Sequence, residues 1–324
     1  MDTITKSASS LGKVKKIAKQ QVLIGILLFL LLVFGVTTKR FFTPNNLLLV
    51  LRQTAVVGVL TIGMTYVLVG GNIDLSVGST VSLTTVIVVR LHDELGPLPA
   101  VLIALAAGVL FGMITGWLVG YLKLNGMITS LGMQNIIYSA ALIYTGNQYF
   151  GLKNTDTWFA YIGRNDIMGI PGQLIIYGIL IIIFQFILRK CIFGKKLIAV
   201  GNNAVCSDYS GIDSKKVVMQ TFIVSGLCAA LAGLILASRS MSGQCNAGQG
   251  MEFDALTATI LGGTSLLGGS GSVAKSFLGV LIIGILKSGF LHLGWNDYIQ
   301  WLAQCIIIVI VVWLDIASSK KVNK

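Results

Sequence analysis

Apolar runs of about 20 residues recur along almost the whole chain, and they restrict the fold more than any other feature. A spanning helix needs about 20 mostly apolar residues, because the hydrocarbon core is about 30 Å thick and offers no water to backbone groups. Hydrophobic residues make up 55% of the 324 residues and charged residues only 11%, whereas soluble domains are about a quarter charged. The sequence therefore predicts an all-α, polytopic integral membrane protein.

About ten segments meet this criterion, and some are interrupted by glycine. The chain holds 38 glycines, which permit close helix packing and the broken or re-entrant helices that transporters use. We expect about ten transmembrane helices, near residues 21–38, 47–70, 75–91, 98–122, 127–146, 172–189, 217–238, 254–269, 273–292 and 297–316.

The basic residues predict how these helices are oriented. Lys123, the run from Arg189 to Lys216, and both ends of the chain are basic, and cytoplasmic loops are enriched in Lys and Arg. An even number of crossings places all of them on one side, so we expect both termini to be cytoplasmic. The formal charge of +12 then reflects loops beside anionic lipid rather than a nucleic-acid surface. We expect one transmembrane domain at 21–316 with a cytoplasmic loop at 190–216, between basic cytoplasmic segments at 1–20 and 317–324.

The first glycine-rich break carries a carboxylate within an apolar stretch. Asn72 and Asp74 lie between Gly71 and Gly78, and a bare charge in hydrocarbon is costly. Asp74 precedes a fresh apolar run, which is typical of a helix N-cap. A direct role at a solute path is a second interpretation, compatible with the first.

Two pairs of amide side chains lie within other predicted helices. These are Gln134 with Asn135, and Gln300 with Gln304 one turn further along their helix. In lipid such amides must find partners across helices or line a wet path. Helix–helix hydrogen bonding is one interpretation, and a path for an uncharged, hydroxyl-rich solute is the other.

A second break contains two carboxylates and a series of glycines. Glu252 and Asp254 precede an apolar run, where negative charge near a helix N-terminus is favourable. We expect these helix-entry carboxylates to contact water and to have no catalytic role, and we expect Lys287 to snorkel to the interface. The structural glycines of the two breaks are Gly71, Gly78, Gly262, Gly263, Gly268, Gly269 and Gly271.

No metal, cofactor or catalytic site is expected. His92 and His292 are the only histidines, and no paired metal-ligand spacing exists. The segment Gly269 to Ser276 comes close to a phosphate-binding loop, but Ala274 replaces the glycine that the motif requires. The chain is therefore not expected to hydrolyse ATP.

Taken together, these motifs resemble the permease subunits of bacterial monosaccharide ABC importers, the ribose, galactose, xylose and arabinose group. That group is in turn similar to the branched-chain amino acid permeases. The resemblance covers about Phe41 to Asp315, and its motifs are Gly71 to Ser79, Ile128 to Gly132, Phe193 to Ile212, and Glu252 to Ala255 followed by Gly262-Gly263 and Gly268 to Ser272.

The resemblance implies a permease that works by alternating access in the bacterial plasma (inner) membrane. It implies a second permease subunit, either another copy or a related chain, a cytoplasmic ABC ATPase and an extracytoplasmic solute-binding protein, all assembled in membrane lipid. In such permeases the internal loop docks into the ATPase, and the matching residues here are Gly201, Asn202, Ala204, Asp208, Ser210 and Gly211. Two positions depart from the pattern: Val205-Cys206-Ser207 replaces Glu-Ala-Ala, and Asn72 replaces a glycine.

The sequence predicts import of a small neutral solute, with a monosaccharide favoured. Import of branched-chain amino acids, nucleosides or a furanone-like signal by the same type of system is the first alternative. A secondary carrier is the second, and it would need a buried relay for protons or sodium.

Overall fold

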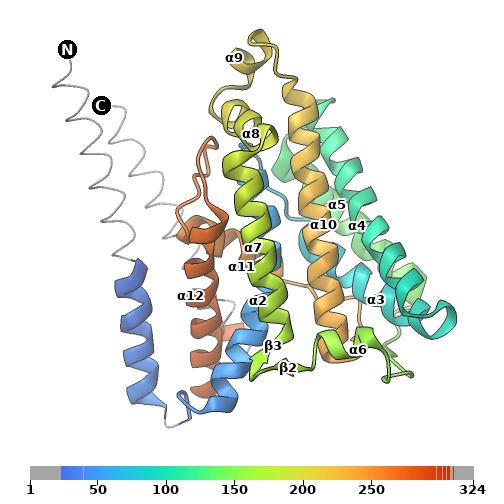
Figure 1. Cartoon of the computed structure of the whole chain (residues 1–324), viewed down its shortest axis with the longest axis vertical. Helices are drawn as coiled ribbons and strands as arrows, with labels where there is room; N and C mark the ends of the chain where they lie inside the picture. The colour runs from blue at the N-terminus through green and yellow to red at the C-terminus, as the bar shows by residue number, and fades with distance from the viewer. Residues whose placement is uncertain are drawn as a thin grey trace.

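The computed structural model describes residues 23–38, 40–296, 298–300, 302–303, 305–306 and 309. Within these residues the chain is almost entirely helical, and its long helices stand side by side (Figure 1). The helices are Leu23–Thr37, α2 (Pro44–Val69), α3 (Val77–Leu95), α4 (Pro97–Gly120), α5 (Gly126–Thr145), α6 (Trp158–Ile162), α7 (Gly172–Lys190), α8 (Ile192–Asn202), α9 (Ala204–Tyr209), α10 (Ser214–Ser240), α11 (Met251–Leu261) and α12 (Val273–His292). The predicted all-α class is confirmed.

Within the described residues, β-strands are confined to two short antiparallel pairs. Strand β1 (Phe150–Gly151) pairs with β4 (Ser242–Gly243), which follows α10. Strands β2 (Asp166–Ile167) and β3 (Ile170–Pro171) form a hairpin before α7. Both pairs lie in connections between helices and make no separate sheet layer.

Six helices in the described residues are long and apolar enough to cross a membrane: α2, α4, α5, α7, α10 and α12. The expected number of about ten is not confirmed. Helix α3 is long enough but carries Arg90, Asp93 and Glu94, and the apolar helix Leu23–Thr37 is shorter. The expected span near 297–316 lies largely outside the described residues.

The expected span near 254–269 is wrong, because its helix is too short. Helix α11 has 11 residues and is therefore about 16 Å long, roughly half the hydrocarbon thickness. It ends at Leu261, and Gly263 then adopts φ +86°, a left-handed conformation that does not continue a helix. The second break is thus a half-helix followed by a glycine-rich loop.

Helices α2 and α10 form the centre of the bundle. In their most apolar windows 67% and 72% of the residues are buried, against 22% to 28% for α4, α5 and α7. Helix α4 approaches α10 through three glycines, because a Cβ atom on Gly108, Gly112 or Gly116 would lie 2.4 to 2.7 Å from a backbone carbonyl oxygen of α10. This spacing of four is the small-residue pattern of close membrane-helix pairs, as the glycine content predicts.

The two ends of the bundle differ in charge. One end, here called the basic end, comprises the end of α4 with Lys123, the end of α7, helices α8 and α9, and the start of α10 with Lys215. Lys123 and Lys215 both lie near Asp208 of α9. Figure 1 shows α8 and α9 at one end of the molecule, and α6, β2 and β3 at the other.

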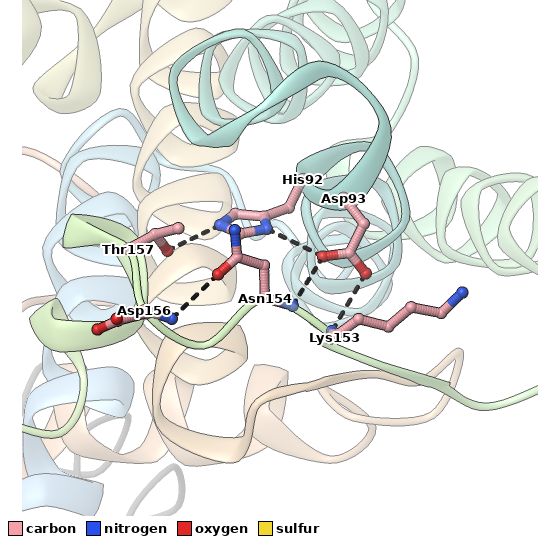
Figure 2. Close-up of polar contacts among 6 residues, drawn as sticks. All are labelled: His92, Asp93, Lys153, Asn154, Asp156 and Thr157. Atoms are coloured by element: carbon pink, nitrogen blue, oxygen red, sulfur yellow. Dashed lines mark hydrogen bonds and ion pairs between the residues drawn. The ribbon is translucent and has the colours of Figure 1, made fainter.

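The opposite end is closed by a loop fastened to the end of α3 (Figure 2). The Asp93 carboxylate accepts hydrogen bonds from the backbone N–H groups of Lys153 at 3.1 Å and Asn154 at 3.2 Å. The ring nitrogens of buried His92 lie 3.3 Å from Asp93 Oδ1 and 2.9 Å from Thr157 Oγ1. These contacts hold residues 153–157 against the end of α3.

Candidate solute path and coupling elements

The first break is held to the centre of the bundle by Asp74. Its side chain is buried, and Oδ1 accepts hydrogen bonds from Ser76 N–H at 3.0 Å and Ser76 Oγ at 2.6 Å. Its Oδ2 accepts from Ser225 Oγ of α10 at 2.7 Å. The N-cap of α3 is Ser76, so the expected N-cap position of Asp74 is wrong by two residues. Asp74 instead forms a turn to the N–H two residues on, which is the usual local bond of an aspartate, and it joins α3 to α10.

The second break buries both helix-entry carboxylates. Glu252 and Asp254 do lie in the first turn of α11, but they are only 2% and 0% exposed, so the expected contact with water is wrong. Asp254 forms an ion pair with Lys287 of α12. Lys287 was expected to snorkel to the interface, but it instead forms an ion pair with a residue of a neighbouring helix. The pair can form because α11 is inserted between α2, α3 and α12.

A polar groove runs along the faces of α3 and α5 and the segment before α11. It consists of two adjoining cavities of about 160 and 150 Å³, which share Tyr138 and Cys245. The other lining residues are Ser79, Ser82, Gln134, Asn135 and Gln249 in the first cavity, and Asn147, Gln148, Tyr149, Gln244 and Asn246 in the second. All of these side chains are uncharged, and most are amides. We call this feature the polar groove.

The amides of Gln134 and Asn135 have defined orientations in the polar groove. The Gln134 Nε2 group donates to Glu252 Oε1 at 3.2 Å, and the Asn135 Nδ2 group donates to the Leu131 carbonyl at 3.1 Å. A carboxylate and a carbonyl only accept hydrogen bonds, so each amide must present its NH2 group to them. The two amide oxygens consequently remain available as hydrogen-bond acceptors.

The other expected path residues that the structure describes do not line the polar groove. Asn72 is partly exposed beside the start of α5, and its Nδ2 donates to the Gly70 carbonyl at 3.2 Å. Gln300 donates to the Trp295 carbonyl of its own segment at 3.1 Å, and Gln304 lies outside the described residues. Among the predicted amides within the described part of the chain, the structure therefore brings only Gln134 and Asn135 to this groove.

Sequence reasoning missed the amides that complete the groove. Gln244, Asn246 and Gln249 lie in the connection between β4 and α11, and Asn147 and Gln148 follow α5. Their signal in the sequence was a cluster of amides in two short connections. Nothing local showed that these connections meet, because strands β1 and β4 bring together segments far apart in the chain.

The internal loop, which by resemblance docks into the ATPase, contains the short helix α9. Helix α9 begins after Asn203, whose Oδ1 accepts from Cys206 N–H at 3.0 Å. Asp208 accepts from both the N–H and the Oγ of Ser214 at 2.9 Å, and the backbone hydrogen bond in particular lowers the pKa of Asp208. Val205 and Tyr209 are 63% and 91% exposed, so α9 presents apolar and aromatic groups at the basic end.

The internal loop and both breaks meet at a single contact. The backbone N–H of Gly269 donates to the Val69 carbonyl at 2.9 Å. A Cβ atom on Gly201, near the end of α8, would lie 1.8 Å from that same Val69 oxygen and 2.6 Å from Gly269 N. Gly268, with φ +87°, lies against Gly71 and the Gly201 carbonyl. Because these backbones are in contact, a movement of α8 would displace the end of α2 and the loop before α12.

Comparison with known proteins agrees with this architecture. The family model described as the permease component of the branched-chain amino acid transport system matches residues 46–313. The ribose import permease protein of Escherichia coli K12 is 34% identical over 89% of this chain and 91% of that protein. That of Bacillus subtilis 168 is 36% identical over 90% and 91%, and the xylose transport system permease protein of E. coli K12 is 30% identical over 93% and 92%.

No solved structure matches the chain with significance. A permease component moves its solute without altering it, so the protein is a transport subunit rather than an enzyme. Because the family model matches most of its length and the curated relatives align with about nine-tenths of it, the chain belongs to the family of permease components that includes ribose and xylose importers.

Proposed function

We propose that this chain is the permease subunit of an ABC importer that carries a monosaccharide across the bacterial plasma membrane. The observation that carries the proposal is the polar groove, whose lining is uncharged and rich in amides. Amide oxygens accept hydrogen bonds from hydroxyl groups, and a neutral polyol needs no counter-charge. The names of the ribose and xylose permeases support the same class of solute.

Branched-chain amino acids fit this groove less well. A zwitterion taken out of water requires opposite charges or strong dipoles near both of its ends. The lining of the groove offers no charged side chain among the described residues. Buried Glu252 accepts from Gln134 through Oε1 and has no hydrogen-bond partner at Oε2, so it offers a counter-charge to the ammonium end of a zwitterion only, while Asp254 is paired with Lys287.

The proposed mechanism is alternating access driven from the basic end. We place the basic end in the cytoplasm, because Lys and Arg accumulate there in membrane proteins, and with it both termini. Helix α9, with its residues Ala204 and Asp208 and the following Ser210 and Gly211, docks into a cytoplasmic ABC ATPase. The contact of Gly201 and Asn202 of α8 with both breaks then transmits ATPase closure to α2 and α12.

Two further partners complete the proposed assembly. A second permease subunit faces the polar groove and closes the path, and an extracytoplasmic solute-binding protein delivers the sugar at the end that carries the loop of Figure 2. The transmembrane permease domain extends over 21–316, between the basic segments 1–20 and 317–324, with residues 190–216 as its coupling loop.

Uptake into proteoliposomes tests this proposal. The vesicles hold the chain with the ATPase and the binding protein encoded beside it, and they receive labelled ribose, xylose, galactose, arabinose and leucine in turn. We expect uptake of one sugar that stops when ATP is replaced by a non-hydrolysable analogue. Uptake of leucine instead of any sugar would overturn the solute class, and uptake that continues without the ATPase would identify a secondary carrier.

A further inference from the structure

A second groove lies at the basic end, away from the polar groove. It occupies about 290 Å³ between α8 and the first turns of α10, and we call it the basic groove. Its lining residues are Ile192, Phe193, Lys196, Asp213, Lys216, Val217 and Gln220. Five of them belong to the internal loop 190–216, but none is among the residues assigned to ATPase docking, to the solute path or to the contact between α8 and the two breaks.

The basic groove keeps an excess of positive charge. Lys196 and Lys216 are both exposed, and neither takes part in an ion pair within the described part of the chain. Asp213 is the N-cap of α10, and its Oδ1 accepts the backbone N–H of Lys216 at 3.0 Å. Two ammonium groups and the Gln220 amide therefore surround a space with a single, already engaged carboxylate.

The position of the basic groove corresponds to the headgroup level of a membrane. Lys216 lies in the first turn of the spanning helix α10, and α8 follows the spanning helix α7 after one residue, Cys191. In Figure 1, α8 lies directly beyond the end of α7 and beside the start of α10. A charged group bound here would remain in the interfacial region, and chains attached to it would lie along the spanning helices.

Exposed apolar side chains lie on the rim of the basic groove and on the neighbouring helix α7. Ile192, on the rim, is 71% exposed, and Phe186 and Ile182, one and two turns before the end of α7, are 60% and 71% exposed. Such exposed apolar groups beside two lysines favour an amphiphile over a soluble anion, because an inorganic anion would leave them in water.

We propose that the basic groove binds the phosphate group of an anionic phospholipid, held by Lys196, Lys216 and Gln220, with its acyl chains along α7. The inference requires the chain to span a membrane with its basic end at an anionic leaflet. It does not depend on the transported solute, and its test does not measure transport.

Native mass spectrometry of the whole chain, released from nanodiscs of phosphatidylcholine and phosphatidylglycerol, measures the preference for anionic lipid. The test variant is Lys196→Gln/Lys216→Gln. The chain offers a matched control, Lys195→Gln/Lys215→Gln, which removes the same charge from neighbouring exposed lysines that do not line the groove. A third variant, Lys196→Arg/Lys216→Arg, retains the charge and reports on folding.

We expect the wild type, the control and the Arg variant to retain phosphatidylglycerol, and the test variant to bind it about 30-fold more weakly. Equal loss in the test and control variants would overturn the proposal in favour of a diffuse surface charge. Inorganic phosphate that displaces the lipid at equal concentration would show a soluble anion site instead. Unchanged lipid binding with lost capture of the ATPase would make the groove an ATPase contact and would also overturn the proposal.

Discussion

The backbone N–H of Gly269 donates a hydrogen bond to the carbonyl oxygen of Val69 at 2.9 Å, and this bond joins the two helix breaks. Val69 is the last residue of α2, and Gly269 lies in the loop between α11 and α12. Gly201 of α8 packs on both, with no room for a side chain. A displacement of the internal loop would therefore press on the end of α2 and on the loop before α12.

Gly201→Ala should uncouple ATP hydrolysis from transport. The new Cβ atom would lie 1.8 Å from the Val69 carbonyl oxygen, so α8 must move away from both breaks, and overpacking of this kind typically costs about 1–3 kcal/mol. We expect ATPase activity of the reconstituted complex to persist while solute uptake falls sharply. Gly178→Ala in α7 is the control, because no atom lies within 4 Å of its added Cβ. Normal uptake by the Gly201 variant would show that this contact is not part of the coupling route.

Gln134→Leu should weaken uptake by about tenfold. This factor corresponds to the loss of one hydrogen bond worth about 1–1.5 kcal/mol. The change removes an acceptor from the polar groove and leaves Glu252 Oε1 without its donor. Concentration-dependent uptake in proteoliposomes measures the effect. Gln300→Leu serves as the comparison, since that amide bonds to Trp295 outside the groove. Equal effects of the two variants would argue against the groove as the path.

Two substitutions of Glu252 should distinguish the effect of its charge from the effect of its hydrogen bond to Gln134. Glu252→Gln keeps an oxygen that can accept from Gln134, whereas Glu252→Leu removes it. We expect the Gln variant to transport better than the Leu variant, with both measured by the same uptake assay. If the two variants behave alike, Glu252 does not act by orienting the Gln134 amide.

The ion pair between Asp254 and Lys287 should stabilise the insertion of α11. Loss of one partner of a buried pair costs about 3–5 kcal/mol, and the 39% exposure of Lys287 places Asp254→Asn, which leaves that lysine partly hydrated, at the lower end of this range. We expect a lower thermal midpoint for Lys287→Met and for Asp254→Asn, and partial recovery in the double variant, which leaves no unpaired charge. Thermal unfolding in detergent measures all three, and additive single effects would show that the two residues are not coupled.

Asp93→Ala should release the loop drawn in Figure 2. Both carboxylate oxygens hold backbone N–H groups, those of Lys153 and Asn154. We expect faster hydrogen exchange over residues 152–157 and little change in α3. Glu94→Ala, at an exposed neighbouring position, should leave exchange in the loop unchanged. If the loop exchanges as slowly in the Asp93 variant as in the wild type, the contact between His92 and Thr157 is sufficient to hold the loop.

The positions of the long helices followed from apolar length. The predicted segments near 47–70, 98–122, 127–146, 172–189, 217–238 and 273–292 correspond to α2, α4, α5, α7, α10 and α12 within a few residues. Backbone groups in hydrocarbon must be satisfied within the helix, so a long apolar run leaves little choice of structure. The prediction of a span near 254–269 was wrong, because hydropathy contains no information on backbone conformation. Helix α11 ends at Leu261, and Gly263 adopts a positive φ.

The roles of the charged residues needed the tertiary structure. Asp254 and Lys287 appeared as a solvated helix entry and a snorkelling lysine when each was considered alone, yet they bond to one another across α11 and α12. Gln134 was found from its polarity within an apolar run, but its partner Glu252 lies far away in the sequence.

The sequence by itself thus determined that the chain is a helical membrane protein, which residues form its long helices, and which permease family it resembles. Only the tertiary structure decided which polar groups meet, where the polar groove lies, and that the internal loop touches both breaks. The physical reason is range: membrane insertion depends on local apolar length, whereas a hydrogen bond or ion pair depends on the approach of two helices that no local pattern encodes.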